Sequence, residues 1–305
     1  MQKTYSVLEL KREVPQEQKG NLILGLLFHV GPSVLFIVLL TLFGMTVFNV
    51  IAFYLLVSAV FMTPIIILER YDPAVEMEMP KMKEFIHGLS VVFYKGLLVG
   101  GSFVALGWWL FSLISPITGT HNGWISITIA VFLTDLAYYM IHRFMSHGSG
   151  NSAIMRLYRK EHGAHHSVSE LDFIRGNQSS LIDTGLSQFQ PSIILISACL
   201  GMNLESTLVA YCFVLMLQST DHVNYTCNIG WLKYLFMDNH AHRFHHCKRG
   251  NLVNHGAVFS IYDRLFGTYY EDWNISSGYM HHNDILLPIK RERTTLFPSP
   301  KETTT

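Results

Sequence analysis

The chain has 305 residues, of which 50% are apolar and only 14% charged, and its formal net charge is zero. Average domains carry about 25% charged residues, so a low-charge chain of this kind is unusual for a soluble protein. The sequence has no net positive charge and no run of lysine and arginine, so it lacks the features of a nucleic-acid-binding protein.

Three long apolar runs follow a polar N-terminal segment. The first, residues 21–68, has no charged residue and is interrupted near Gly44, which predicts two membrane-spanning helices. The second, residues 96–134, is also uncharged and is broken by proline and glycine, which predicts two more. The third, residues 184–220, carries one charge and predicts a helical hairpin with a short second arm. We therefore expect an all-α, polytopic membrane protein with four to six transmembrane helices.

The positions of lysine and arginine predict its orientation. All 22 of them lie in the N-terminal tail, in the 70–95 loop, or from Arg143 onward, and the two hairpin tips have none. Positive residues favour the cytosolic side, so the C-terminal half should be cytosolic. The expected organisation is a cytosolic tail at 1–20, transmembrane helices at 21–141, a catalytic domain at 142–270 that includes the hairpin at about 184–220, and a C-terminal tail at 271–305.

Histidines gather in the C-terminal half in four short motifs. These are HRFMSH, HGAHH, DHVNY and HRFHH, and they contain His142, His147, His162, His165, His166, His222, His242, His245 and His246. In H-x-x-H-H, which occurs twice, a helix directs three imidazoles into an arc of about 100°. Two such faces turned toward each other would bring six ring nitrogens into one small volume.

The spacing of the first motif is different. His142 and His147 are five residues apart, about 140° around a regular α-helix, so the helix must end between them or each must serve a different metal. Asp135 lies seven residues before His142 on the same helix face. We expect its carboxylate to accept the second ring N–H of a metal-bound histidine. Together with Tyr139 and Arg143, it stands at the end of an apolar span, where ionisable residues tend to be functional.

Nine imidazoles are too many for one ion, because a tetrahedral zinc takes about four ligands. Two octahedral ions would use them and leave positions for oxygen or water. Imidazole binds iron, zinc, copper and nickel, so the residues favour a dinuclear iron centre for oxygen chemistry without excluding zinc.

The stretches DLAYYMIHRFMSH, HGAHH, QSTDHVN and HRFHH, followed by NHGAVFSIYDRLFGTYY, resemble the sterol desaturase and fatty acid hydroxylase superfamily of membrane di-iron enzymes. The resemblance runs from about Asp135 to Tyr270. It implies a helical membrane enzyme that uses two iron ions, O2 and an external electron donor, with the nine histidines above as metal ligands. Asp135, Tyr139 and Asn224 are the other candidate catalytic residues. His255 stands where the family commonly has tyrosine or phenylalanine, and whether it or His240 is a ligand stays open.

The function expected from these features is hydroxylation of an unactivated C–H bond in a lipid or other apolar substrate, such as a fatty acyl chain or a sterol. A desaturase with the same ligands is the near alternative. A membrane metal-binding or transport protein is the alternative from another class, although only His29 lies deep in a long apolar run.

No Fe–S or haem motif is present in the sequence. The electron donor is therefore expected to be a separate protein, cytochrome b5-like or ferredoxin-like. It should dock near Arg243, Lys248 and Arg249. The expected location is a bacterial inner membrane or the endoplasmic reticulum, as a multi-pass protein with the histidine site on the cytosolic face of the bilayer.

Overall fold

The structure is a computed structural model that describes residues 22–71, 73, 82–115, 123–166, 171–176, 189–225, 229–246 and 252–270. Within these ranges the regular structure is helical, apart from two isolated bridges, and this confirms the all-α expectation. The two expected tails, 1–20 and 271–305, lie outside the described residues, and the proposed domain boundaries stay a prediction.

The described helices are α2 (Leu22–His29), α3 (Gly31–Phe43), α4 (Val47–Tyr71), α5 (Met82–Phe93), α6 (Gly101–Ser112), α7 (Trp124–Ile141), α8 (Ala153–His165), α9 (Phe173–Gly176), α10 (Gln190–Cys199), α11 (Leu204–Gln218), α12 (Asn239–His245) and α13 (Ile261–Leu265). The interruption expected near Gly44 is confirmed, since α3 ends at Phe43 and α4 begins at Val47 and packs against it. Gly44 has a φ of 89°, a conformation that glycine adopts without the steric penalty of a Cβ atom.

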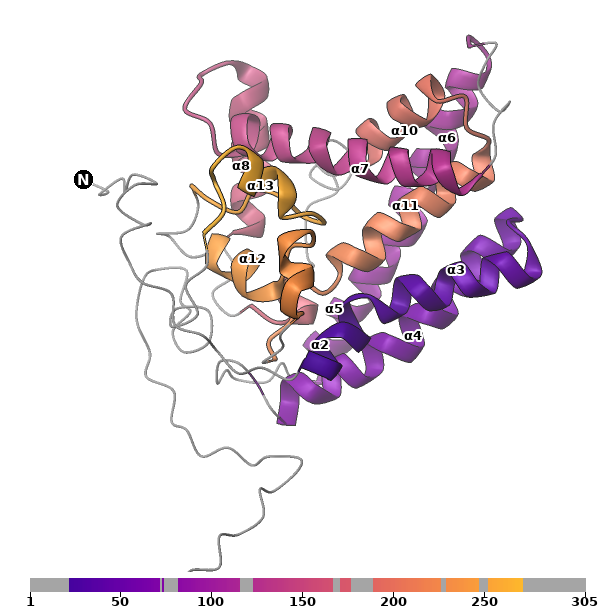
Figure 1. Cartoon of the computed structure of the whole chain (residues 1–305). Helices are drawn as coiled ribbons and strands as arrows, with labels where there is room; N and C mark the ends of the chain where they lie inside the picture. Colours follow the sequence, from indigo (N-terminus) through magenta and orange to yellow (C-terminus); the bar gives the residue numbers. More distant parts are fainter. Residues whose placement is uncertain are drawn as a thin grey trace, which may run out of the picture.

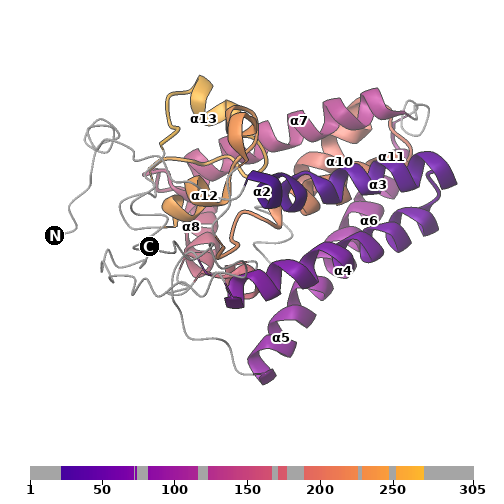
Figure 2. The ribbon, with the colours of Figure 1, turned by 60° about the horizontal axis from the view of Figure 1, so that its bottom comes forward.

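Long helices form one bundle, and the short helices that carry the histidines gather at one end of it (Figures 1 and 2). Helix α11 lies inside the bundle and packs against α3, α4, α6, α7 and α10. Its sequence is apolar on all sides, which is typical of a helix buried all round. The main hydrophobic core therefore lies between α11 and its neighbours, beside the histidine-rich end, which we call the head (α8, α12 and α13).

The outer faces of the bundle are strongly apolar. Ile23 is 77% exposed, Phe48 77% and Ile125 78%. Side chains of this type, exposed along the outside of several helices, form a surface much larger than a soluble monomer usually presents to water. The surface fits association with a lipid bilayer.

By length and composition alone, fewer of the described helices could span a bilayer than we expected. Two described helical stretches are long and apolar enough to cross a bilayer, Val47–Arg70 and Trp124–Ser146, and α2 with α3 forms a third if this pair, bent by 43°, is one span. The remaining apolar helices are shorter. In the third apolar run the expected hairpin is present, but its short arm is the first, α10 with 10 residues, and not the second, α11 with 15. The prediction of four to six spans is not confirmed.

One buried acid joins the bundle to the head. Glu69, in the last turn of α4, is 7% exposed, and its Oε1 accepts the backbone N–H of Phe173 at 2.8 Å and of Asn224 at 2.6 Å. Both donors lie in segments beside the histidines. Since buried N–H groups without an acceptor are costly, this carboxylate stabilises the position of the head relative to α4.

We expect Glu69→Ala to lower the free energy of unfolding by about 2–6 kcal/mol, because it leaves two buried N–H groups without an acceptor. Thermal unfolding of the detergent-purified protein measures the loss. Glu69→Gln, which keeps an acceptor oxygen, is the matched control and should lose less. Equal unfolding temperatures for Glu69→Ala and the unaltered chain would contradict this role.

Candidate metal centre

A π-helical turn solves the spacing problem of the first histidine motif. Helix α7 ends at Ile141, and residues His142–Ser146 continue as a π-helix, closed by a bond of 3.1 Å from the His147 N–H to the His142 carbonyl. This i→i+5 ladder has more residues in each turn than an α-helix, so residues five apart lie on nearly the same side. Both imidazoles therefore face one site. Of the two sequence-based alternatives, a helix end between the two histidines is confirmed, since the π-helix ends at Ser146, and two different metals are not supported, since both rings belong to one group.

The two H-x-x-H-H motifs lie at the C-terminal ends of α8 and α12. Each helix has a capped start: Ser152 accepts the N–H of Met155, and Asp238 accepts the N–H of Ala241. The caps fix where each helix begins and hence which way its last turn points. Each motif then divides its histidines between two sites instead of presenting all three to one.

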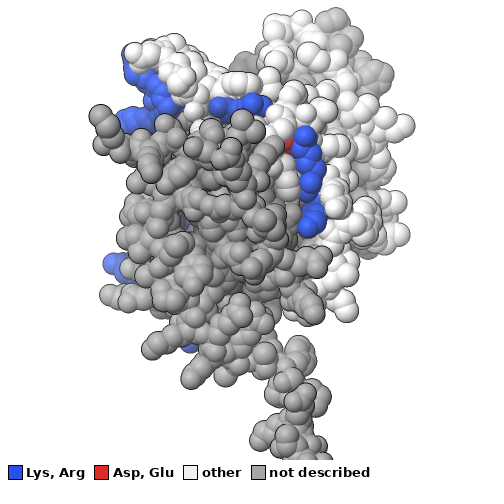
Figure 3. All heavy atoms as spheres, turned by 60° about the vertical axis from the view of Figure 1, so that its left-hand side comes forward, with Lys and Arg blue, Asp and Glu red and all other residues white. Residues whose placement is uncertain are grey.

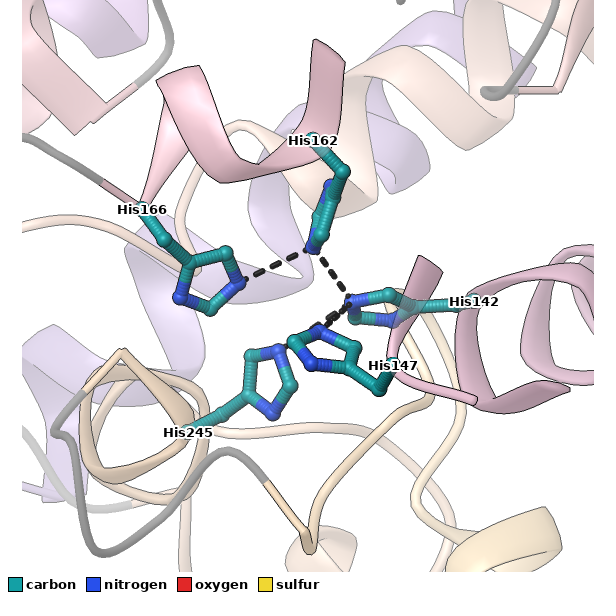
Figure 4. A group of neighbouring side chains, drawn as sticks. All are labelled: His142, His147, His162, His166 and His245. Carbon is teal, nitrogen blue, oxygen red and sulfur yellow. Dashed lines mark hydrogen bonds between the residues drawn. The ribbon is translucent and has the colours of Figure 1, made fainter. Parts of the chain in front are cut away.

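All nine expected histidines come together in two adjacent groups. The five-histidine group contains His142, His147, His162, His166 and His245, and the four-histidine group contains His165, His222, His242 and His246. Within each group the potential ligand nitrogens lie within 4.8 Å of one another. Figure 4 shows the rings of the five-histidine group, which come from three separate elements and converge on one point. The two groups share a wall, since the rings of His166 and His246 stack with centroids 4.3 Å apart.

Backbone carbonyls orient two rings of the five-histidine group. Nδ1 of His142 lies 2.6 Å from the His255 carbonyl oxygen, and Nδ1 of His245 lies 2.7 Å from that of Val253. A carbonyl oxygen only accepts hydrogen bonds, so each Nδ1 carries the proton, and in a neutral ring each Nε2 presents a bare lone pair. These two Nε2 atoms are 3.1 Å apart. Two lone pairs at this distance repel, and a cation between them removes the repulsion, so the group fits a metal ion.

Burial keeps these imidazoles neutral. Desolvation lowers the pKa of His245 from 6.5 to about 4, although the Val253 carbonyl acts in the opposite direction. Burial, and then the neighbouring imidazoles, also lower the pKa well below 6.5 for His147, His162, His166, His222, His242 and His246. Neutral imidazole is the form that binds a metal, so the head is ready to bind one at neutral pH.

The C-terminal motif is the scaffold for those carbonyls. Asp263, which is fully buried, accepts the backbone N–H groups of His255 at 2.8 Å and Gly256 at 2.7 Å, and the Thr268 hydroxyl at 2.7 Å. Asn254 has a φ of 56°, and its side-chain amide donates to the carbonyls of Ala241 and Tyr270. Asparagine tolerates this left-handed conformation better than most residues. The motif thus fixes the loop that holds the rings of His142 and His245.

The other candidate catalytic residues have mainly structural contacts. Asp135 is buried, and its two oxygens accept the backbone N–H groups of Val258 and Phe259 at 2.9 and 2.8 Å. The expected bond to a histidine ring is wrong, because the carboxylate instead ties α7 to the C-terminal motif. The Tyr139 hydroxyl accepts Arg143 Nη1 at 2.7 Å and lies 2.9 Å from the Thr268 hydroxyl.

The backbone N–H of Asn224 donates to Glu69 of α4 at 2.6 Å, and catalytic roles for Asn224 and Tyr139 stay a prediction. His255 is buried, with its ring centroid 5.4–5.6 Å from those of His142, His147 and His245. His240 is also buried. Neither is in the two groups, so the structure does not favour either as a ligand.

Sequence reasoning missed Glu69 and Asp221. Each had a signal, because Glu69 is a lone acid directly after an uncharged run and Asp221 directly precedes His222 in an apolar region. Asp221 is fully buried beside the four-histidine group. Burial, together with the charges of Asp135 and Asp238, raises the pKa of Asp221 well above its usual range.

Comparison with known proteins agrees with this site. Residues 127–268, slightly less than half of the chain, match the family model of fatty acid hydroxylases. This region contains the nine histidines and the C-terminal motif through Thr268, so the expected resemblance to the sterol desaturase and fatty acid hydroxylase superfamily is confirmed. This region is similar to fatty acid hydroxylases, a family that suggests an oxidoreductase of hydroxylase or desaturase type, a lipid substrate and association with membranes. No curated protein and no solved structure matches the chain significantly.

We expect the metal-free protein to lose stability as the pH falls below about 6.5. The sign follows from the pKa of His245, which is 6.5 when unfolded and about 4 when folded. Between these values the unfolded chain binds a proton that the folded chain does not, so acid favours unfolding. Unfolding temperatures of the metal-free protein at a series of pH values measure the effect. His245→Gln should show a shallower decline, and a flat profile for the unaltered chain would refute the assignment.

Proposed function

We propose that the protein is an O2-dependent di-iron monooxygenase that hydroxylates an unactivated C–H bond of a lipid or other apolar substrate. The observation that carries the proposal is the pair of adjacent, largely buried groups of imidazoles at one end of an apolar helical bundle, in each of which the potential ligand nitrogens lie within 4.8 Å of one another. The fatty acid hydroxylase match over the same residues supports it.

The numbers of imidazoles favour iron over zinc. Five imidazoles exceed the roughly four ligands of a structural zinc, and four would fill a tetrahedral zinc completely. A six-coordinate ion keeps one or two positions open at either group, as a reaction with O2 requires. The native metal is therefore expected to be iron.

In this reaction one oxygen atom of O2 enters the C–H bond and the other leaves as water, with two electrons and two protons taken from outside the chain. Two bound irons would supply the O2 activation and the hydrogen abstraction. The two histidine groups would hold the metals, and the site excludes water, since His142, His222 and His245 are almost completely buried. The carbonyls of Val253 and His255 hold the ring protons on Nδ1 and keep each Nε2 free to bind a metal.

The apolar outer faces support an integral membrane location. We place the head at the cytosolic side of a multi-pass bundle, because the hairpin tips carry no lysine or arginine and the head carries many. An apolar substrate dissolved in the bilayer would then reach the metals along the bundle, from the lipid side.

The test is metal content combined with product mass. The detergent-purified chain is expected to contain about two irons, and His165→Ala with His245→Ala, one ligand from each group, should lose them. With reductant and 18O2, the lipid product should gain one labelled oxygen atom. A chain with no bound metal after iron-replete expression would overturn the proposal.

Product mass and metal uptake separate the alternatives. A desaturase would use the same histidines but release a product that lacks two hydrogens and contains no label. A metal transporter would move metal into sealed vesicles. Among the described residues, all the histidines of the two groups lie at one end of the bundle, which disfavours a transport path.

The expected docking site for the electron donor needs correction. Arg243 is completely buried, and its guanidinium donates to the carbonyls of Leu171 and Val223, so it cannot contact a partner. Lys248 and Arg249 lie outside the described residues. Figure 3 shows lysine and arginine on the side of the molecule that it views, and the described residues there present little acidic surface. We propose that an acidic donor docks on α8, where Arg156 and Lys160 are exposed six and two residues before His162, the first metal-site histidine of that helix.

We expect Lys160→Glu to slow association with an acidic donor roughly 2- to 10-fold, because it reverses an exposed charge in the encounter surface. Lys160 is 80% exposed, so metal content should not change. Stopped-flow reduction of the metal-loaded protein by a cytochrome b5-like or ferredoxin-like donor measures the rate. Lys83→Glu, an exposed lysine on α5, is the matched control and should react normally. Equal rates for the two variants would argue against docking on α8.

A further inference from the structure

The two histidine groups differ in what holds their rings. In the five-histidine group, neutral backbone carbonyls accept the Nδ1 protons of His142 and His245 at 2.6 and 2.7 Å. In the four-histidine group, Nδ1 of His222, His242 and His246 is buried without a hydrogen-bond partner among the described residues. Metal-bound histidines normally donate this second ring N–H to a carboxylate, carbonyl or water. The four-histidine group therefore has donors that need an acceptor.

Asp221 is an acceptor of the complementary kind. Its side chain is fully buried, and neither carboxylate oxygen has a hydrogen-bond partner among the described residues. Oδ2 lies 3.9 Å from Nδ1 of His242, which is ion-pair distance but longer than a hydrogen bond. A buried charged carboxylate without donors is strongly unfavourable, so the group either stays neutral, in the direction of its raised pKa, or needs a donor or a positive charge beside it.

Two neighbouring carboxylates bond backbone N–H groups instead. Asp135 accepts two backbone N–H groups at 2.8–2.9 Å, and Asp238 accepts the N–H of Ala241 at 2.7 Å as the cap of α12. Both are therefore held in place by the backbone. The competing acceptor is the carbonyl of Gly256, which lies near the His242 ring and raises the pKa of that histidine. The choice for Nδ1 of His242 is thus between a charged side chain and a neutral carbonyl.

We propose that Asp221 is the positioning residue of the four-histidine metal site, accepting the Nδ1 proton of His242 so that Nε2 of the same ring points at the metal. The inference rests on the proposed metal centre and deepens it. It needs a closure of less than 1 Å from the 3.9 Å separation to reach hydrogen-bond distance. The hydrogen bond to the carboxylate would then increase the basicity of the His242 ring as a metal ligand.

The two metals would then be chemically different. The five-histidine metal is bound by imidazoles whose two known supports are neutral carbonyls, and the four-histidine metal has one fewer imidazole but a nearby negative charge. The carboxylate offsets the missing ligand, because a negative charge close to a cation stabilises it in a buried site.

Metal affinity in single-site proteins tests the proposal. Replacing both His142 and His147 by alanine removes two ligands of the five-histidine group and keeps all four of the other, while replacing both His222 and His242 does the reverse. In the first protein, Asp221→Asn should weaken binding of Fe2+ or Co2+ by about 10- to 100-fold, as measured by competition with a coloured chelator. In the second protein the same change should have no effect. The visible spectrum of bound Co2+ should shift only in the first case.

The controls distinguish positioning from folding. Asp135→Asn alters a buried carboxylate that bonds only backbone in the structure, and it should lower the unfolding temperature without favouring either site. Asp221→Glu keeps the charge and should restore part of the affinity lost in Asp221→Asn. If the asparagine variant does not fold, Asp221→Glu is measured in its place. Compared with Asp221, it should bind metal more weakly, and only at the four-histidine site.

Two results would overturn the inference while leaving the proposed function intact. One is unchanged affinity at the four-histidine site, which would assign Nδ1 of His242 to the Gly256 carbonyl. The other is equal loss at both sites together with a lower unfolding temperature, which would make Asp221 a purely structural residue. Absence of metal from the unaltered protein would instead refute the metal centre itself.

Discussion

The hydrogen bonds from two ring nitrogens to backbone carbonyls determine the chemistry of the head. With Nδ1 of His142 and His245 bound to the carbonyls of His255 and Val253, the protons stay at the outer nitrogens and bare lone pairs face inward at 3.1 Å. Such an arrangement is unfavourable without a cation and favourable with one. The C-terminal motif therefore acts on the metal site through the carbonyls it fixes, although none of its residues belongs to the two histidine groups.

Backbone geometry assigns the histidines to their sites. The π-helical turn after α7 brings His142 and His147 to the same group, and the end of α8 sends His162 and His166 to that group but His165 to the other. The end of α12 divides its histidines in the opposite sense, two to the four-histidine group and one to the five-histidine group. The motifs are thus interleaved, and neither site can form from one segment of the chain.

The sequence allowed the nine histidines, the helical class and the superfamily resemblance to be predicted, because each depends on local spacing or on motifs. The π turn was not predicted, because the five-residue spacing was compared only with the geometry of a regular α-helix. Asp135 was misassigned because a helix face does not show which distant backbone will reach it, and the N–H groups of Val258 and Phe259 did so. Arg243 was misjudged as a surface charge because burial depends on tertiary packing; its side chain is fully buried and donates to the carbonyls of Leu171 and Val223.

The stacked rings of His166 and His246 belong to different groups, with centroids 4.3 Å apart and planes inclined by 17°. Each ring is a wall of the neighbouring site as well as a member of its own. Packed interiors leave little free volume for a ring to move alone, so a displacement of one ring is transmitted to the other. The two sites are therefore structurally coupled, and a change of coordination at one metal would alter the ring positions at the other.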